Sequence, residues 1–244
     1  MSASVIVHGL EQVRARLAAA LASADRASDG ARLVAVSKFQ PASAIRAAYA
    51  AGQRDFGENY VQELQEKAAE LADLTDLRWH MIGHLQRNKA RAVAPLASLI
   101  HTVHSVELAR ELDKRAATVT IDGARAFLAG DARLSVLVEV NVGGEAQKSG
   151  CAPEALADVL HALHDAQHLR VAGLMCVPPH SEAPSAARPF FDELVRLREV
   201  HGGAARLPEL SMGMTADLEY AVAAGATIVR VGTAIFGERP KASG

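Results

Sequence analysis

The stretch Leu-Val-Ala-Val-Ser-Lys-Phe-Gln-Pro, residues 33–41, is a short apolar run that ends in one lysine, with a proline close behind. Its apolar side chains alternate between two faces, which predicts a strand buried on both sides. Lys38 follows on the face of Val34 and Val36, so its amine would leave from the end of a buried surface. Burial lowers the pKa of a lysine, and the neutral amine attacks aldehydes. The alternative is a strand that simply ends, with Lys38 in solvent.

The composition excludes several classes of function. The 244 residues carry a net charge of −2, without the basic excess expected of a nucleic-acid-binding protein. Cys151 and Cys176 lie far apart and fit no zinc or disulfide pattern, so we expect no metal and a reducing compartment. No signal peptide is recognisable, and no run of about 18 apolar residues occurs. These features predict a cytoplasmic protein that binds neither membranes nor nucleic acids.

Strand-like and helix-like segments alternate eight times, without a composition break that would mark a linker. This alternation predicts a parallel sheet, and eight units in this length predict a single (β/α)8 TIM barrel over residues 1–244. An amphipathic helix within residues 1–30 is expected to pack on the barrel as an extra N-terminal element. A doubly wound sheet is the alternative topology. The expected strands are residues 33–38, 55–59, 78–83, 99–104, 134–141, 169–177, 209–211 and 227–232.

Two smaller expectations concern the connections. Thr215 is expected to cap a helix that ends at Gly225. Residues 119–131 show no regular pattern and are expected to be irregular.

Small residues follow the last two expected strands, where a barrel of this type presents its functional face. Ser211, Met212 and Gly213 close the seventh strand, and Gly232 and Thr233 close the eighth. Glycines let backbone N–H groups approach an anion, and the hydroxyl groups add donors. Tight turns alone would explain either loop. Both loops together, on adjacent strands, predict a phosphate site.

Arg230 lies within the eighth strand, on the same face as Gly232. A guanidinium inside a barrel needs a carboxylate or a ligand, so an ion pair with Glu139 or Glu219 is one interpretation. The other is a contact with a bound molecule. A lysine that can form an imine, a phosphate site and a buried arginine together predict pyridoxal 5'-phosphate as the cofactor.

Several motifs, spread over nearly the whole chain, carry a family resemblance: Val34–Pro41, Phe56–Glu63, Trp79–Lys89, Gly173–Cys176, Leu210–Thr215 and Val229–Gly237. In this order they resemble the YggS-like (PROSC-type) pyridoxal phosphate homeostasis proteins. The resemblance implies a barrel like the N-terminal domain of alanine racemase, with the cofactor on Lys38 as a Schiff base. It also implies that Ser211, Gly232 and Thr233 hold the phosphate. Arg230 would face the ring nitrogen, and Asn59 would line the pocket.

An arginine beside the ring nitrogen leaves that nitrogen unprotonated, which weakens the cofactor as an electron sink. Enzymes of the alanine racemase type use two positioned bases, and none of Tyr49, Tyr60 and Tyr220 stands out as one. We therefore expect a monomer that carries or buffers the cofactor for vitamin B6 homeostasis, with little or no turnover. It would contact pyridoxal phosphate-dependent apo-enzymes transiently. The alternatives are a racemase or lyase with the same cofactor, and a cofactor-free aldolase with an imine on Lys38.

Two further features have simpler interpretations. Arg87, Lys89 and Arg91 form a basic helix face, which is either solvated or a dock for an acidic partner. Lys148, in the loop after the fifth strand, is a candidate for a second, transient imine.

Overall fold

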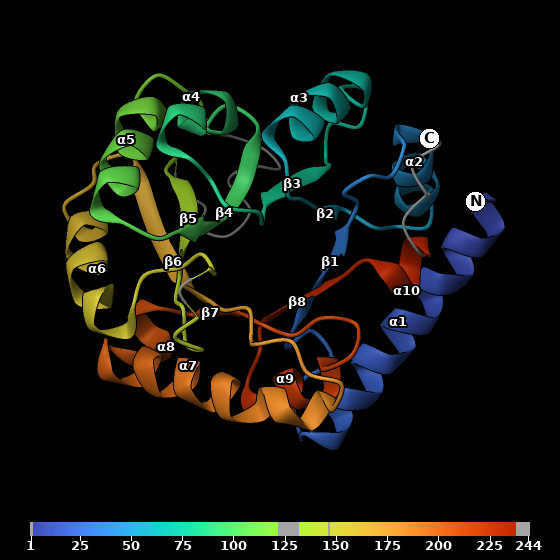
Figure 1. Cartoon of the computed structure of the whole chain (residues 1–244). Helices are drawn as coiled ribbons and strands as arrows, with labels where there is room; N and C mark the ends of the chain where they lie inside the picture. Colours follow the sequence, from blue (N-terminus) through green and yellow to red (C-terminus); the bar gives the residue numbers. More distant parts are fainter. Residues whose placement is uncertain (1, 122–131, 146, 238–244) are drawn as a thin grey trace.

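Eight parallel strands close into a barrel in the order β1 to β8, with helices around it (Figure 1). This structure, a computed structural model, describes residues 2–121, 132–145 and 147–237. Residues 122–131, within the segment expected to be irregular, lie outside the described residues. The strands are β1 (Arg32–Val36), β2 (Asp55–Glu58), β3 (Arg78–Met81), β4 (Ala97–Val103), β5 (Leu134–Glu139), β6 (Leu169–Met175), β7 (Glu209–Ser211) and β8 (Ile228–Val231).

The pairing of β8 with β1 closes the barrel. Leu33 lies opposite Val229 in this pair, and Val34 lies opposite Arg230. A doubly wound sheet keeps its edge strands apart, so this pairing confirms the TIM barrel and rules out the alternative topology. The residues that follow β1 and β8 are therefore neighbours.

The helices follow the expected order, with differences at their ends. Their bounds are α1 (Ala3–Ser23), α2 (Ala42–Ala50), α3 (Val61–Glu70), α4 (Ala90–Val93), α5 (Val106–Ala116), α6 (Leu156–His164), α7 (Arg188–Val200), α8 (Gly203–Arg206), α9 (Leu218–Ala224) and α10 (Thr233–Phe236), with 3-10 turns η1 (Arg87–Lys89), η3 (Pro153–Ala155) and η4 (Pro184–Ala187).

The predicted Thr215 cap is wrong, because α9 begins after Asp217, whose carboxylate accepts a hydrogen bond from the Met214 N–H. Gly225, at a φ of 108°, ends that helix as predicted.

Helix α1 lies along the outside of the barrel against α2, α9 and α10 (Figure 1). Its buried residues recur at helical spacing and include Leu10, Val13 and Leu17. Gly9 allows the close approach to α10, since a Cβ there would lie 2.6 Å from the Ala234 carbonyl oxygen. Because α10 directly follows β8, α1 supports the residues at the end of that strand. None of the described helices is long and apolar enough to cross a membrane.

The apolar core consists of two clusters of buried side chains. The larger lies between the strands and the surrounding helices. The smaller fills the barrel interior and consists of Val34, Leu99, Leu137, Ala172, Met175 and Ile228. Strand alternation places further residues in the same interior, and several of them are polar: Asp55, His80, His101, Glu139, Ser211 and Arg230. Buried polar side chains are stable only when they are hydrogen-bonded, so their contacts locate the candidate site.

Candidate functional site

Lys38 lies in a tight turn at the C-terminal end of β1. The Ser37 N–H donates to the Gly57 carbonyl at 2.9 Å, which extends the sheet one residue beyond β1. Phe39 has a φ of 63°, a left-handed conformation that costs a residue with a side chain about 1–3 kcal/mol. Such a conformation persists only where surrounding contacts hold it.

A largely buried ion cluster next to the turn, formed by Ser37, Glu58, Lys67 and the partly exposed Glu63, supplies these contacts. We call it the Lys67 cluster. Lys67 Nζ donates to the Ser37 carbonyl at 2.8 Å, to Glu58 at 2.8 Å and to Glu63 at 2.7 Å. The Ser37 hydroxyl donates to Glu58 at 2.6 Å, and the Phe39 N–H donates to Glu63 at 2.7 Å. Burial raises the pKa of Glu58, and Lys67 opposes that shift. The backbone on both sides of the site lysine is thereby tied to one ion cluster.

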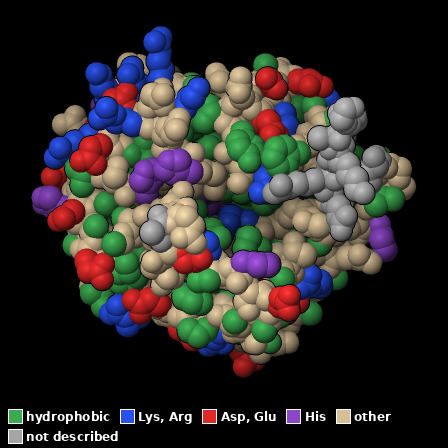
Figure 2. Space-filling model, viewed as in Figure 1, with side chains coloured by type: hydrophobic (Ala, Val, Ile, Leu, Met, Phe, Trp, Pro, Cys, Tyr) green, Lys and Arg blue, Asp and Glu red, His purple; other side chains and the backbone are tan. Residues whose placement is uncertain are grey.

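Lys38 lines a cavity of about 180 Å³ together with the turn that follows β8. Val36, Gln40, Gly232 and Thr233 also line it. Gly232 allows this close packing, because a Cβ there would lie 3.0 Å from the Val36 carbonyl oxygen. The barrel face in Figure 2 is hollowed near its centre, with Lys or Arg side chains inside the hollow. Three of the predicted site residues, Lys38, Gly232 and Thr233, therefore surround one cavity.

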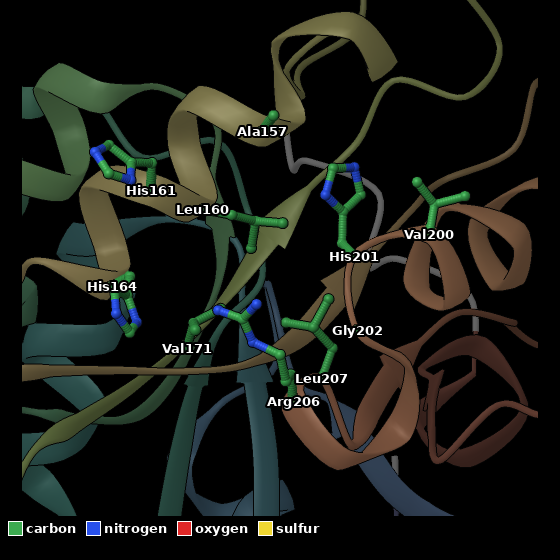
Figure 3. A pocket seen from close by; sticks show the side chains of 10 residues that line it. All are labelled: Ala157, Leu160, His161, His164, Val171, Val200, His201, Gly202, Arg206 and Leu207. Atoms are coloured by element: carbon green, nitrogen blue, oxygen red, sulfur yellow. The ribbon is translucent and has the colours of Figure 1, made fainter.

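A larger hollow of about 430 Å³ lies elsewhere, between α6, β6 and the segment that joins α7 to α8 (Figure 3). His161, His164, His201 and Arg206 are among its lining side chains, and none of them lines the Lys38 cavity. In the described ranges, no group of three or more His, Cys, Asp or Glu side chains is placed to hold a metal ion. The converging polar groups lie at the Lys38 cavity and in the barrel interior, so we place the candidate site there.

Arg230 is buried inside the barrel and donates two hydrogen bonds. Its Nη1 donates to Ser211 Oγ at 2.6 Å, and its Nη2 donates to the Cys176 carbonyl at 3.0 Å. An ion pair with Glu219 is ruled out, because Glu219 lies on the outer surface and pairs with Arg16 at 2.8 Å. Burial lowers the pKa of Arg230, and nearby acidic groups oppose the shift. A guanidinium has five N–H groups, so donors remain for a ligand.

A chain of buried hydrogen bonds continues from Ser211 through the barrel interior, and our sequence analysis missed it. His101 Nδ1 lies 2.8 Å from Ser211 Oγ. His101 Nε2 lies 2.9 Å from His80 Nδ1, and His80 Nε2 lies 2.9 Å from Asp55 Oδ1. We call Asp55, His80, His101 and Ser211 the histidine relay. The inward parity of His80 and His101 on neighbouring strands is the signal that could have found it.

Burial sets the charges in the histidine relay. It lowers the pKa of His80, and it lowers that of His101 well below the ordinary value, so both rings are neutral at neutral pH. Burial alone would raise the pKa of Asp55, but hydrogen bonds from His80 and Arg78 outweigh it and lower that pKa. Asp55 is therefore a carboxylate, next to two neutral imidazoles.

Asn59 and Met212, two other predicted site residues, differ in their placement. The Asn59 Oδ1 atom is buried and has no hydrogen-bond partner among the described residues. A Cβ at Gly83 would overlap the Asn59 backbone, so the two segments are tightly packed. The Met212 side chain is buried in the outer apolar cluster, and its N–H donates to the Ile228 carbonyl at 3.1 Å. The Met212 side chain and N–H thus both have partners within the fold, whereas the Asn59 Oδ1 atom accepts no hydrogen bond from the described residues.

Glu139 is a buried acid at the end of β5, inside the barrel. Its Oε2 atom has no hydrogen-bond partner in the described part of the chain. Burial raises the pKa of Glu139 to about 7, although Arg230 opposes the shift. The folded protein therefore holds this proton more tightly than the unfolded chain does, and stability decreases as the pH rises from about 4.5 to about 7.

The variant Glu139→Gln is expected to be more stable than the parent at pH 8, by about 1–3 kcal/mol, because glutamine never ionises. The difference should shrink towards pH 5, where Glu139 is protonated in the fold. Urea unfolding at both pH values checks this, with the exposed Glu182→Gln as the control. An equal effect at the two pH values would contradict the assigned titration.

Comparison with known proteins places the chain in a family. Residues 9–240 match the family model described as the N-terminal domain of alanine racemase. The pyridoxal phosphate homeostasis protein of Pseudomonas aeruginosa is 44% identical over 237 residues, which cover 97% of this chain and 96% of that protein. The protein of the same name from Escherichia coli K12 is 42% identical, with 96% and 97% covered.

Solved structures give the same result. PipY of Synechococcus elongatus PCC7942, in the structure with pyridoxal phosphate bound, is 39% identical with a TM-score of 0.72, covering 91% of this chain and all of PipY. An unknown protein from Bifidobacterium adolescentis is 36% identical with a TM-score of 0.85, with 96% and 95% covered. Alanine racemase from Corynebacterium glutamicum, at 18% identity and a TM-score of 0.68, shares the fold; 99% of this chain and 63% of that one are covered. This chain belongs to the family of pyridoxal phosphate homeostasis proteins, which are built on the alanine racemase N-terminal barrel.

Proposed function

We propose that this chain binds pyridoxal 5'-phosphate on Lys38 and carries or buffers it, with little or no catalytic turnover. One observation carries the proposal: a single cavity brings Lys38 together with Gly232 and Thr233, and the buried Arg230 lies two residues before Gly232 in β8, which pairs with β1. The names of the relatives and the cofactor in the PipY structure support it. As a monomeric cytoplasmic carrier, the protein would meet apo-enzymes transiently.

The residues around the cavity fit a phosphorylated pyridine aldehyde. When bound, the cofactor would supply an aldehyde carbon with which the Lys38 amine would form an imine, the aldehyde oxygen leaving as water. The unpartnered Oδ1 of Asn59 is available to a hydroxyl group on the ring. The Lys67 cluster holds the backbone around Lys38, so the amine is presented from a fixed turn.

We assign the phosphate to the turn between β8 and α10. Thr233 begins α10, so its N–H has no acceptor within the helix, and its hydroxyl is a further donor. Ser211 stays a predicted phosphate ligand, and its hydroxyl lies in the barrel interior between His101 and Arg230. Of the two predicted loops, the turn after β8 is the one whose residues line the Lys38 cavity.

Arg230 favours a carrier over an enzyme. Its guanidinium can donate to a ring nitrogen but cannot protonate it, which leaves the cofactor a weak electron sink. The Tyr49 hydroxyl, on the outer helix α2, is occupied, because it donates to Asp76 in the turn before β3. Tyr60 is exposed at the rim, where its ring packs against Phe39 at a centroid distance of 5.3 Å. These placements support a protein that holds the aldehyde rather than one that turns over amino acids.

The test combines a spectrum with a turnover assay on the whole protein. Added pyridoxal 5'-phosphate is expected to produce a new visible absorbance band, and amino acids are expected to be neither racemised nor decarboxylated at a steady rate. Steady turnover that requires Lys38 would establish the racemase or lyase alternative. A protein that stays colourless with excess cofactor would contradict both and leave the cofactor-free aldolase.

The variant Arg230→Gln is expected to weaken cofactor binding about 10-fold to 100-fold, the range for losing a hydrogen bond from a buried charge. Its absorbance band should also shift, because the contact with the ring nitrogen changes. Spectral titration measures both, with the exposed Arg206→Gln as the matched control. An unchanged band in Arg230→Gln would count against the ring contact.

A further inference from the structure

We infer that every hydrogen bond of the histidine relay is donated in the direction of Asp55. The Ser211 hydroxyl then donates to His101, and its oxygen serves as an acceptor for Arg230. The inference rests on the proposed function, in which Arg230 is the group that meets the cofactor ring. None of the relay residues lines the Lys38 cavity, so they act as positioning residues.

The direction of the relay is decided at its Asp55 end. Arg78 donates to both Asp55 oxygens, at 2.8 Å and 2.6 Å, and Arg32 lies 4.0 Å away. These cations keep Asp55 ionised, and a carboxylate can only accept hydrogen bonds. His80 must therefore carry its proton on Nε2, which faces Asp55 at 2.9 Å.

Each following proton is then determined. A neutral His80 with its proton on Nε2 presents a lone pair on Nδ1, so His101 must donate to it from Nε2. The His101 Nδ1 atom is then also an acceptor. Among the residues that the structure describes, the Ser211 hydroxyl is its hydrogen-bond partner, at 2.8 Å, so Ser211 donates there. Every member of the relay is satisfied in this arrangement.

The consequence lies at the Ser211 end. Once its proton is committed to His101, Ser211 Oγ offers only lone pairs, and Arg230 Nη1 donates to them at 2.6 Å. With the Cys176 carbonyl at 3.0 Å, two acceptors fix the plane of the guanidinium. If the relay ran the other way, the Ser211 proton would be free to point at a ligand. Through the relay, the Asp55 carboxylate therefore makes Ser211 a hydrogen-bond acceptor towards Arg230.

The first test reads the tautomers directly. Nitrogen-15 NMR of histidine-labelled protein, without cofactor, is expected to show His80 and His101 neutral at pH 7, both with the proton on Nε2. The same result is expected in Lys38→Ala, because the relay does not depend on the cofactor. A proton on Nδ1 of either ring, or a charged ring, would overturn the inference.

The second test asks whether the relay positions Arg230. A glutamine at position 101 can accept from Ser211 through its oxygen and donate to His80 through its nitrogen. We expect His101→Gln to bind pyridoxal 5'-phosphate within about twofold of the parent, and His101→Leu to bind about tenfold more weakly, with a band shifted like that of Arg230→Gln. A protein that folds but responds equally to both substitutions would overturn the inference.

A second pair of variants covers the case in which His101→Leu does not fold. Ser211→Thr keeps the hydroxyl and should retain the parent band, whereas Ser211→Ala removes the acceptor of Arg230 and should shift it. A parent band in Ser211→Ala would contradict the positioning part. If the parent protein fails to bind the cofactor but shows the expected tautomers, the proposed function fails while the relay's direction stands.

Discussion

Replacing Lys67 with Met is expected to lower the free energy of unfolding by about 3–5 kcal/mol, because it leaves a buried carboxylate without its cation. Glu58 is fully buried, and Lys67 Nζ lies 2.8 Å from it. The substitution also releases the Ser37 carbonyl, so the left-handed turn at Phe39 loses a restraint. We expect the loss to be larger at pH 8 than at pH 5, since an unpaired Glu58 can take up a proton in acid.

Urea unfolding of Lys67→Met measures this loss, and the exposed Lys89→Met serves as the control for removing a lysine. The double variant Lys67→Met with Glu58→Gln should recover part of the loss, because no buried charge is then left unpaired. A loss below about 1 kcal/mol in the single variant would show that the cluster does not hold the turn.

Replacing Lys38 with Ala is expected to abolish the visible band and to weaken cofactor binding by at least about a hundredfold, because the covalent link is lost. The fold should change little, by about 0.5 kcal/mol at most, since Lys38 lies in a turn at the edge of the core. Large loss of binding with small loss of stability is the combination that marks a ligand-attachment residue.

The control for this variant is the exposed Lys114→Ala, which should match the parent in band and affinity. Lys148→Ala tests the expected second imine; its amine donates to the Pro178 carbonyl at 2.9 Å and pairs with Glu145 at 2.6 Å. A band that persists in Lys38→Ala and disappears in Lys148→Ala would move the attachment to Lys148.

The sequence could predict residues whose placement depends on a single strand. Alternation within β1 places Lys38 on the inward side, and the position of Gly232 after β8 places it at the same end of the barrel. The alternation of strands and helices indicated the closed barrel, and closure makes these two segments neighbours. The cavity around Lys38 was therefore predictable from local patterns and one assumption about topology.

The barrel interior could not be predicted in the same way, because its contacts depend on the register between strands. His80 and His101 meet across β3 and β4, and the register shifts between Trp79 and His80. Parity predicts that both rings face inward but not that their nitrogens come within hydrogen-bond distance. Ser211 shows the same limit: β7 ends at Ser211 as expected, but the contacts of its hydroxyl with His101 and Arg230 depend on where β4 and β8 place those side chains.

Borohydride reduction of the protein loaded with pyridoxal 5'-phosphate, followed by peptide mapping by mass spectrometry, tests the central claim most directly. Reduction makes the link permanent, so the modified lysine can be identified. We expect one principal modification, on Lys38 in the peptide that contains residues 33–41. A principal modification on Lys67 or Lys148, or no modified lysine in a protein that has gained the band, would contradict it.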